Sequence, residues 1–559
     1  MSESLRIANG RVYDPANGID GVIGDVLALD GHVVASLPPD AAPRTIDASG
    51  LVVMPGGVDM HCHIASSTVN RARAMQGEEH AAHVHPACPA RGLRGGSGVL
   101  TPSTFLTGYR YAALGYTTAV EAAVAPSAAR QSHLELGDTP NLDAGLLLLV
   151  ANHEKVIELL DAGQESSAVA FIQELLYRTG ALGIKVVNPG GVASWRRDAR
   201  QHIIESIDDP VAGTGRVTPR RLLELAATTA ETLGLAHPPH VHCNRLGVAG
   251  NVQTTLDTLK ALEGRRVHLT HLQFHAYGRG PRGQVRSAAP RVCAALDAHP
   301  LVTADVGQVM FGDAVTLTAD TPLEHLLHKL VGPGAGRYVS IESELETGCG
   351  LMPIRYGDRN ILHSRQWAIG LELLLGCSDP WRMVLSTDHP NGGSFLSYPA
   401  IIAQLMSKAV RDETLARANR RALSHAPLRD MDRQMSLQEI AIITRAGPAR
   451  ALGLSHKGHL GPGADADVTI YEDNQSDPQA MFTTPRYVIK GGRVLVEDGE
   501  LRHAVEGRRL RADLAPSPQG QRELDDWFGR RGSYSVSQFG MHPHELEAMA
   551  VVRQASSGD

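Results

Sequence analysis

Two histidines separated by one residue, His61 and His63, follow an apolar run at residues 51–55 and give the strongest chemical signal in the chain. Side chains of a β-strand alternate between its two faces, so both imidazoles point to the same side. Neutral imidazole is a common ligand of transition metals. We therefore predict that His61 and His63 bind one metal ion at the C-terminal end of a buried strand.

Other His-x-His pairs occur at residues 83/85, 240/242 and 542/544. The chain has 26 histidines, so some pairs are expected by chance. The pair at 83/85 lies in an irregular stretch and the pair at 542/544 in the C-terminal tail, and for both we predict exposed loop histidines.

Lys185 lies inside an otherwise apolar strand candidate at residues 183–187. A buried ammonium ion without a partner is energetically costly. One interpretation pairs Lys185 with a buried carboxylate. The other, which we favour, is that its amine reacts with carbon dioxide and becomes a carbamate, an anion that can bridge two cations.

Three further candidates stand at the ends of later strands: His242, His271 and Asp388. We prefer His242 to His240, and His271 to His268, because each lies nearer the end of its strand. Asp388 can bind a metal and also accept a proton from a water molecule. The alternative for Asp388 is a turn or helix N-cap.

Short apolar segments alternate with helical segments through the middle of the chain. Eight strand candidates, separated by helices such as 220–235 and 367–375, favour an α/β fold, a (β/α)8 TIM-like metallo-hydrolase barrel. An open doubly wound sheet is the alternative, but no Gly-x-Gly-x-x-Gly turn follows the first strand. The strand candidates are residues 52–60, 117–123, 146–150, 183–187, 240–243, 267–271, 302–306 and 383–387.

Both ends of the chain have strand-like texture with Asn9-Gly10 and Asp30-Gly31 as candidate hairpin turns. We predict a small β-sandwich domain built from residues 1–52 and 455–510, a barrel at 53–454, and a C-terminal extension at 511–559 that packs on the body or binds a partner.

Composition, charge and cysteine spacing argue against several classes of protein. A net charge of -7 offers no basic footprint for nucleic acid, and no apolar run approaches the length of a membrane span. The N-terminus lacks the pattern of a secretory signal. Six cysteines without a Cys-x-x-Cys pair indicate neither a disulfide framework nor a Cys-bound metal. We expect a cytoplasmic protein.

The motifs at residues 55–63 and 461–467 resemble the amidohydrolase superfamily of dihydroorotases and hydantoinases. Longer motifs resemble the family of formylmethanofuran dehydrogenase A subunits, which includes the hydrolytic subunit of the bacterial formyltransferase/hydrolase complex. These longer motifs are residues 103–111, 183–191, 240–247, 268–277, 305–313, 366–372 and 387–393.

The resemblance implies two divalent metals, expected to be Zn²⁺, and N6-carboxylysine at Lys185. The implied ligands are His61, His63, Lys185, His242, His271 and Asp388. It also implies a methanofuran-type C1 carrier as substrate and a hetero-oligomer with formyltransferase and accessory subunits. Within the motifs we predict these substrate-binding residues: Tyr109, Asn188, Asn244, Gln273, His389 and Asn391.

The predicted reaction cleaves the formamide of the carrier and releases formate, with Asp388 moving the proton from water to the leaving amine. Tyr109 or a histidine would stabilise the oxyanion. Candidate contacts for an acidic carrier tail are Arg71, Arg73, Arg91, Arg94, Arg196 and Arg197. Three alternatives remain open: a subunit working in the formylating direction, a cyclic-imide hydrolase of the dihydroorotase type, and a catalytically silent scaffold.

Overall fold

A computed structural model describes residues 4–75, 104–198, 203–323, 327, 338–341, 348–531 and 535–554. In this part of the chain, eight parallel strands pair with one another in sequence order. A parallel bridge between Cys62 and His389 connects the last strand to the first, and His63 N donates to His389 O at 2.8 Å. The strands are β6 (Gly57–Cys62), β7 (Tyr116–Val124), β8 (Asp143–Leu149), β9 (Gly183–Val187), β10 (His240–His242), β11 (Val267–Leu269), β14 (Val302–Asp305) and β18 (Met383–Val384).

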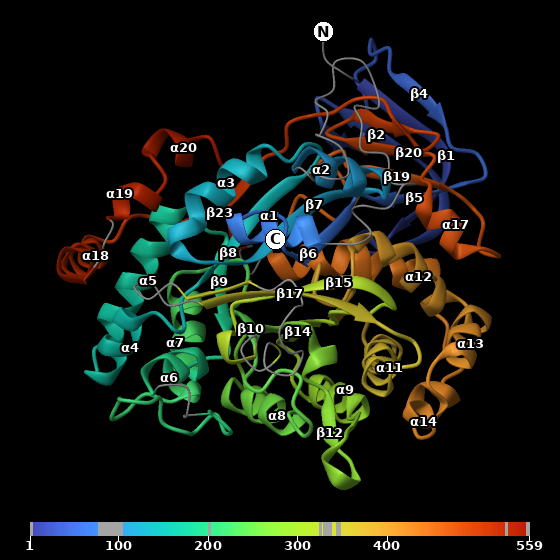
Figure 1. Ribbon diagram of the computed structural model, residues 1–559. Helices are drawn as coiled ribbons and strands as arrows, with labels where there is room; N and C mark the ends of the chain where they lie inside the picture. The colour runs from blue at the N-terminus through green and yellow to red at the C-terminus, as the bar shows by residue number, and fades with distance from the viewer. Residues whose placement is uncertain are drawn as a thin grey trace.

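The predicted barrel architecture is confirmed, and each of these strands overlaps its predicted segment. All residues of β6, β9, β10 and β11 are buried, as expected for parallel strands covered on both faces. Figure 1 shows the helices arranged around these strands. They include α3 (Ala129–Gly137), α4 (Glu154–Asp161), α5 (Glu165–Thr179), α6 (Gly191–Arg197), α7 (Pro219–Thr232), α8 (Val252–Ala261), α9 (Ala289–Ala298), α11 (Ile361–Gly376), α12 (Tyr398–Met406), α13 (Lys408–Arg417), α14 (Arg420–Leu423), α15 (Leu437–Ala441) and α16 (Gly447–Leu452).

Helix α7 begins where the sequence predicts it. The Thr218 side chain caps the helix by accepting a hydrogen bond from Arg221 N, and Pro219 occupies the first turn, where its missing N–H costs nothing. The second predicted helix, at 367–375, lies within the longer α11. None of the described helices is long and apolar enough to cross a membrane.

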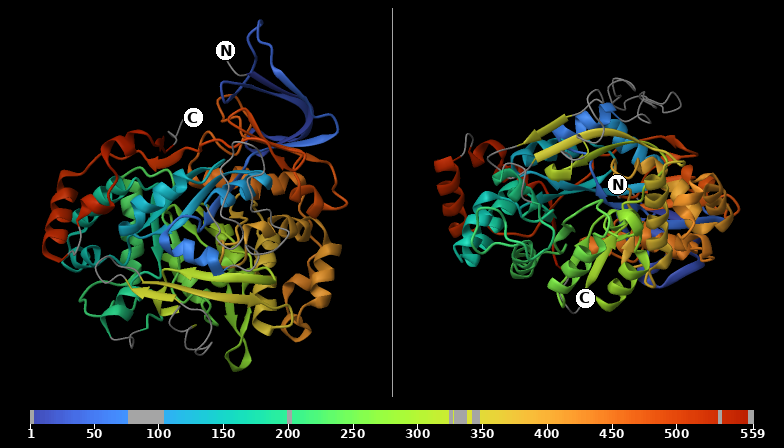
Figure 2. Two further views of the ribbon diagram at one scale, coloured as in Figure 1. Left: turned by 45° about the horizontal axis from the view of Figure 1, so that its top comes forward. Right: turned by 60° about the horizontal axis from the view of Figure 1, so that its bottom comes forward.

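Strands from both ends of the chain form one nine-stranded sheet, seen at the upper right of Figure 1 and from another side in Figure 2. Helix α2 (Thr104–Ala113) contacts β21 and β22 of this sheet, and α17 (Pro478–Thr483) contacts β19. The strands are β1 (Ser4–Asp14), β2 (Ile19–Leu29), β3 (His32–Val34), β4 (Arg44–Asp47), β5 (Leu51–Pro55), β19 (Val468–Glu472), β20 (Tyr487–Lys490), β21 (Arg493–Glu497) and β22 (Glu500–Leu501).

Two local predictions at the N-terminus need correction. Asn9-Gly10 is not a hairpin turn: β1 continues through it with a register shift against β2 between Ile7 and Gly10, and Asn9 has a left-handed φ of 61°. The first predicted barrel strand, 52–60, is two strands, because β5 pairs with β1 and β19 in the terminal sheet. The chain changes sheets at Gly56, where a Cβ would lie 2.4 Å from Thr117 Oγ1. Asp30-Gly31 does form the predicted turn between β2 and β3.

The C-terminal extension contributes to the barrel sheet, which the sequence does not predict. β23 (Arg509–Ala512) pairs with the start of β8, and β24 (Ala550–Val552) pairs with β23. Helix α18 (Pro518–Arg531) packs along α5, as Figure 2 shows beside the shorter helices α19 (Val536–Phe539) and α20 (Pro543–Glu547). The predicted domain boundaries otherwise stay a prediction.

A small antiparallel sheet follows β14 in the sequence. It contains β15 (Gly312–Thr318), β16 (Tyr338–Ile341) and β17 (Gly348–Tyr356). Helix α1 (Ser67–Met75) packs on it through Val69 and Ala72, which share an apolar cluster with Val315 and Leu317. A separate hairpin consists of β12 (Tyr277–Arg279) and β13 (Val285–Ser287).

A buried ionic network joins the barrel to the terminal sheet. Lys457 Nζ lies 2.6 Å from Asp143 Oδ2, 3.0 Å from Asp465 Oδ2 and 2.5 Å from Asp467 Oδ2. Lys490 Nζ is 3.0 Å from Asp143 Oδ1. Burial would raise the pKa of Asp143, but the charges of Lys490, Lys457 and Arg508 outweigh it and hold that pKa well below its usual range.

Replacing Lys457 with methionine should destabilise the protein by about 3–5 kcal/mol, because it leaves buried carboxylates without their shared cation. Urea unfolding measures the change. The control is Lys408→Met in α13, which removes a more exposed pair with Asp412 and should cost less than about 1 kcal/mol.

The effect should depend on pH with a defined sign. A carboxyl with a depressed folded-state pKa stabilises fully above its unfolded pKa of about 3.9, and the contribution disappears as the pH falls towards the folded value. The stability difference between wild type and Lys457→Met should therefore shrink below about pH 4. A difference that stays constant into strong acid would contradict this account.

Candidate metal centre

Asp388 lies among buried imidazoles, in the segment that follows the last barrel strand, β18. Its Oδ1 lies 3.1 Å from His61 Nε2 and 3.2 Å from His63 Nε2. His61, His271 and Asp388 each place a potential ligand atom within 4.8 Å of the others. The structure thus brings both rings of the His-x-His pair at the end of β6 against the predicted aspartate that follows β18.

Two further carboxylates hold these imidazoles from behind. His63 Nδ1 lies 2.8 Å from Glu121 Oε1, and His61 Nδ1 lies 2.9 Å from Asp305 Oδ2. A carboxylate on the second nitrogen fixes the orientation of a metal-binding histidine and increases its basicity. The Nε2 atoms of both rings are thereby left to face Asp388. Glu121 is itself fixed, because its Oε2 accepts hydrogen bonds from Ile64 N and Ala65 N.

Lys185 is buried in β9, and its Nζ has no hydrogen-bond partner among the described residues. Burial lowers the pKa of the amine to about 8, although the charges of Asp388, Asp305 and Glu121 oppose the shift. The pairing of Lys185 with a buried carboxylate, which the sequence left open, is thus not a hydrogen-bonded one. Burial thus favours the neutral form of the Lys185 amine, which is the form that reacts with carbon dioxide to give a carbamate.

His242 lies beside His271, with ring centroids 4.7 Å apart. His242 Nε2 is 3.4 Å from Asp320 Oδ2, a third carboxylate behind an imidazole. His240, which the sequence assigns to the core, contacts His61 Nδ1 at 3.3 Å and His237 at 3.0 Å. Asp305 also lies 3.2 Å from His268 Nε2, so His268 too faces inward behind His61.

Backbone conformation helps to aim these groups. Asp388, His271 and Asn188 all adopt the left-handed region, with φ of 51°, 36° and 41°. This backbone conformation is uncommon for residues other than glycine. It occurs most often at sites where the surrounding structure holds functional side chains in place. All three follow the carboxyl ends of barrel strands, where the active sites of such barrels form.

Three of the predicted substrate-binding residues belong to hydrogen-bonded networks around the centre. Asn391 donates to Asp388 Oδ1 at 3.1 Å and exchanges bonds with the backbone of Leu317 in β15. Asn188 donates to Asp320 Oδ1 at 2.9 Å and accepts from Asn244 at 2.7 Å. These contacts give the asparagines a role in positioning carboxylates. Their contact with substrate stays a prediction.

The other three predicted positions are buried but turn to different neighbours. His389 packs edge-on against Phe395, and burial lowers its pKa to about 3. Gln273 donates to Tyr277 Oη at 2.9 Å. Tyr109 is buried in α2.

Of the arginine candidates, Arg196 and Arg197 pair with Glu154, and Arg73 is buried beside Ile64 O. Arg71 lies in α1. Arg91, Arg94 and the histidines at 83/85 lie outside the described residues.

Four buried residues at the centre are absent from the predicted set: Glu121, Asp305, Asp320 and His275. Glu121 carried the same signal as Lys185, a charge inside an apolar strand, and Asp305 closes a predicted strand. His275 stands four residues after His271 and belongs to the same motif, residues 268–277. Asp320 had no signal, because only the folded chain brings it to His242.

The donor set fits divalent metals. Imidazole nitrogens and a carboxylate converge there, and buried atoms without a hydrogen-bond partner among the described residues remain on Lys185 Nζ and His271 Nδ1. Nitrogen and oxygen donors of this kind bind zinc and similar transition metals.

Barrel and site together define a metal-binding hydrolase fold, and the chain matches the amidohydrolase family over residues 44–496. It belongs to that family. It is 42% identical to the Fhc A subunit of the formyltransferase/hydrolase complex of Methylorubrum extorquens, over 94% of each chain. It is 40% identical to Protein FwdA of Methanocaldococcus jannaschii, over 91% of this chain and 90% of that protein.

Among solved structures, the chain resembles the formyltransferase/hydrolase complex (FhcABCD) from Methylorubrum extorquens in complex with methylofuran. The TM-score is 0.90 at 37% identity, and the match covers 99% of this chain and 100% of that chain. A dihydroorotase of Streptococcus pneumoniae is 52% identical over only 11% of this chain and 14% of its own length. The likeness to dihydroorotases is therefore local.

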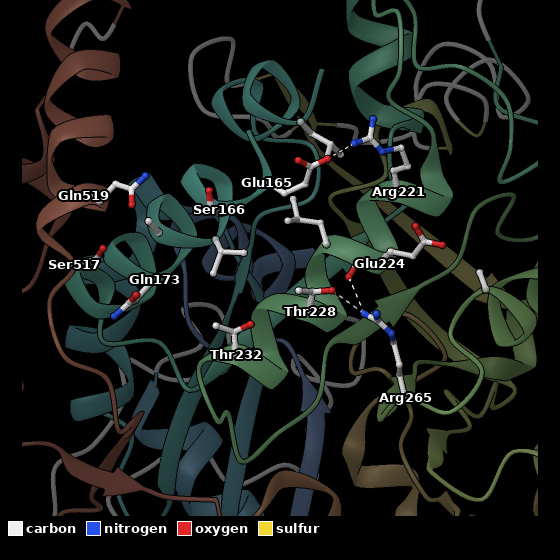
Figure 3. A pocket seen from close by; sticks show the side chains of 15 residues that line it. Glu165, Ser166, Gln173, Arg221, Glu224, Thr228, Thr232, Arg265, Ser517 and Gln519 are labelled. Atoms are coloured by element: carbon white, nitrogen blue, oxygen red, sulfur yellow. Dashed lines mark hydrogen bonds and ion pairs between the residues drawn. The ribbon is translucent and has the colours of Figure 1, made fainter. Parts of the chain in front are cut away.

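A cavity of about 760 Å³ lies far from this chemistry in the fold, between α5, α7 and the start of α18. Figure 3 shows Arg221 paired with Glu165 and Arg265 bonded to Thr228 along its wall. None of the candidate ligands lines it, and Glu165, Arg221 and Arg265 on its wall are held in ion pairs.

Replacing Glu121 with glutamine should weaken metal binding about 10–100-fold, because His63 loses the carboxylate that orients it. Titration of the metal-free chain with Zn²⁺ against a competing chelator measures the change. Glu372→Gln is the matched control, since Glu372 is equally buried but accepts hydrogen bonds from Ser287 and Leu428 N. Equal affinity in both variants would refute the orienting role of Glu121.

Proposed function

We propose that this chain is the hydrolytic subunit of a formyltransferase/hydrolase complex, and that it releases formate from the formamide of a methanofuran-type C1 carrier. The observation that carries the proposal is the full-length similarity to the Fhc A subunit, at 42% identity over 94% of both chains. The structural similarity to the methylofuran-bound complex supports the same substrate class and a hetero-oligomeric assembly.

The proposed centre holds two divalent metals, expected to be Zn²⁺. His61, His63 and Asp388 would bind one, His242 and His271 the other, and a carbamate on Lys185 would join them. The buried, unpartnered Lys185 amine and the orienting contacts of Glu121 and Asp305 support this arrangement. Bound there, the metals would supply a water of lowered pKa and polarise the formyl oxygen.

The chain's own residues handle the proton. Asp388 takes the proton of the attacking water at its carboxylate and delivers it to the carrier nitrogen as the C–N bond breaks, so the products are formate and a free amine. Asn391 holds the carboxylate by donating to Oδ1. His61, His63 and Asp388 are buried, which strengthens each electrostatic contact between them.

A formylating subunit is the second candidate function, because the long motifs of the chain resemble formylmethanofuran dehydrogenase A subunits. The same residues would serve both directions, because each elementary step is reversible. A silent scaffold is disfavoured by the intact set of donors, and a cyclic-imide hydrolase by the short dihydroorotase match.

Formate release from an N-formylated furfurylamine carrier tests the proposal. We expect release by the metal-loaded full chain, together with its co-purified subunits, measured with a formate dehydrogenase assay. Ring-opening of dihydroorotate or a hydantoin without formate release would move the protein to the cyclic-imide class. Incubating formate with the free amine tests the reverse direction.

Replacing Asp388 with asparagine should lower kcat about 10²–10⁴-fold, because the proton acceptor is lost. Metal content should stay near wild type, since the imidazoles and Lys185 remain. Steady-state formate release and metal analysis on the same preparation measure both. Near-normal turnover in this variant would show that another group moves the proton.

A further inference from the structure

His275 is a buried histidine to which neither the predicted ligand set nor the proposed reaction gives a role. Its side chain is fully buried, and both ring nitrogens lack a hydrogen-bond partner among the described residues. A neutral imidazole carries one donor and one acceptor, and leaving both unpaired in the interior is unfavourable. Such a side chain requires something to bind.

The neighbours of His275 are two of the predicted ligands. Its ring centroid lies 5.2 Å from that of His242 and 5.3 Å from that of His271. The three residues each offer a ring nitrogen, and these nitrogens lie within 4.8 Å of one another. Three imidazoles around one point are a recurrent zinc-binding arrangement that leaves a fourth position open.

The backbone holds the imidazole of His275 in place. The 3-10 turn Leu272–Phe274 lies between His271 and His275 and brings them to the same side. His275 N donates to Leu272 O at 2.9 Å, and Thr255 Oγ1 donates to the His275 carbonyl at 2.9 Å. The ring is thus presented from a fixed main chain, as a preorganised ligand should be.

Asp320 adds a second feature of a metal site. Its carboxylate lies 3.4 Å from His242 Nε2, so the Nδ1 of that ring remains for a metal. Asp320 is in turn fixed by Asn188, which donates to Oδ1. A carboxylate behind a ligating histidine is the usual outer support of such a site.

We propose that His275 is a third imidazole ligand of the metal held by His242 and His271. This inference rests on the proposed two-metal centre and gives one of its metals three protein imidazoles. That metal is then held mainly by histidines, whereas the metal at His61 and His63 depends more on the carbamate. Loss of Lys185 should therefore release one metal before the other.

The test counts metals and observes their surroundings in the full chain. Metal-free wild type, His275→Ala and His275→Gln are reloaded with Zn²⁺ for elemental analysis and with Co²⁺ for visible absorption, which reports coordination number. His133→Ala is the control, because His133 is an equally buried imidazole that contacts Thr179 O instead. We expect both His275 variants to bind one metal more weakly by at least the about 10–100-fold that loss of an outer partner of a metal site costs, and to lose part of the Co²⁺ band.

Unchanged affinity, metal count and Co²⁺ spectrum in the His275 variants would overturn the inference. Thermal unfolding of the metal-free forms tests whether the variants are folded, because metal-free His275→Gln should unfold like metal-free wild type. Added metal should then raise the Tm of wild type more than that of the variant. Metal counting does not require turnover. If the protein releases no formate but the His275 variants bind metal more weakly, the proposed reaction is rejected and His275 is still a ligand. If the protein releases formate but the His275 variants bind metal like wild type, the reaction is kept and His275 is not a ligand.

Discussion

The buried amine of Lys185 is the constraint on which the rest of the site depends. An ammonium ion in that position would have no hydrogen-bond partner among the described residues. Metal cations bound by the neighbouring imidazoles would add further positive charge close to it. Conversion to a carbamate removes the cation and supplies an anion. The carboxylates of Glu121, Asp305 and Asp388 also offset positive charge at the centre, because each faces an imidazole there.

The barrel makes this concentration of ionisable groups possible. Parallel strands in sequence order bring residues from β6, β7, β9, β10, β11, β14 and β18 to one region, although they are hundreds of positions apart in the chain. The ionic network around Lys457 connects the terminal sheet to β8 of the barrel. In addition, β23 pairs with β8, and α18 packs against the barrel helix α5. Rigid support of this kind is what a site of fixed ligands requires.

Much of the fold and of the ligand geometry follows from local sequence signals. Short apolar runs marked all eight barrel strands. The predicted ligands His61, His63, His242, His271 and Asp388 were chosen because each lies at or near the end of one of them, and the structure brings these side chains together. The signals failed where tertiary pairing decides. Residues 52–60 read as one apolar strand, yet Gly56 divides them between two sheets, and Asn9-Gly10 has hairpin chemistry inside a continuous strand. Asp320 was not predictable, because it reaches His242 only through the folded chain.

Carbon-13 NMR of the metal-loaded chain, prepared with ¹³C-bicarbonate, tests the central claim most directly. A carbamate on Lys185 predicts a carbamate resonance in wild type that Lys185→Met abolishes, together with a loss of bound metal in that variant. A fully metal-loaded, active protein that shows no such resonance would contradict the account, because its metals would then be held without the buried lysine.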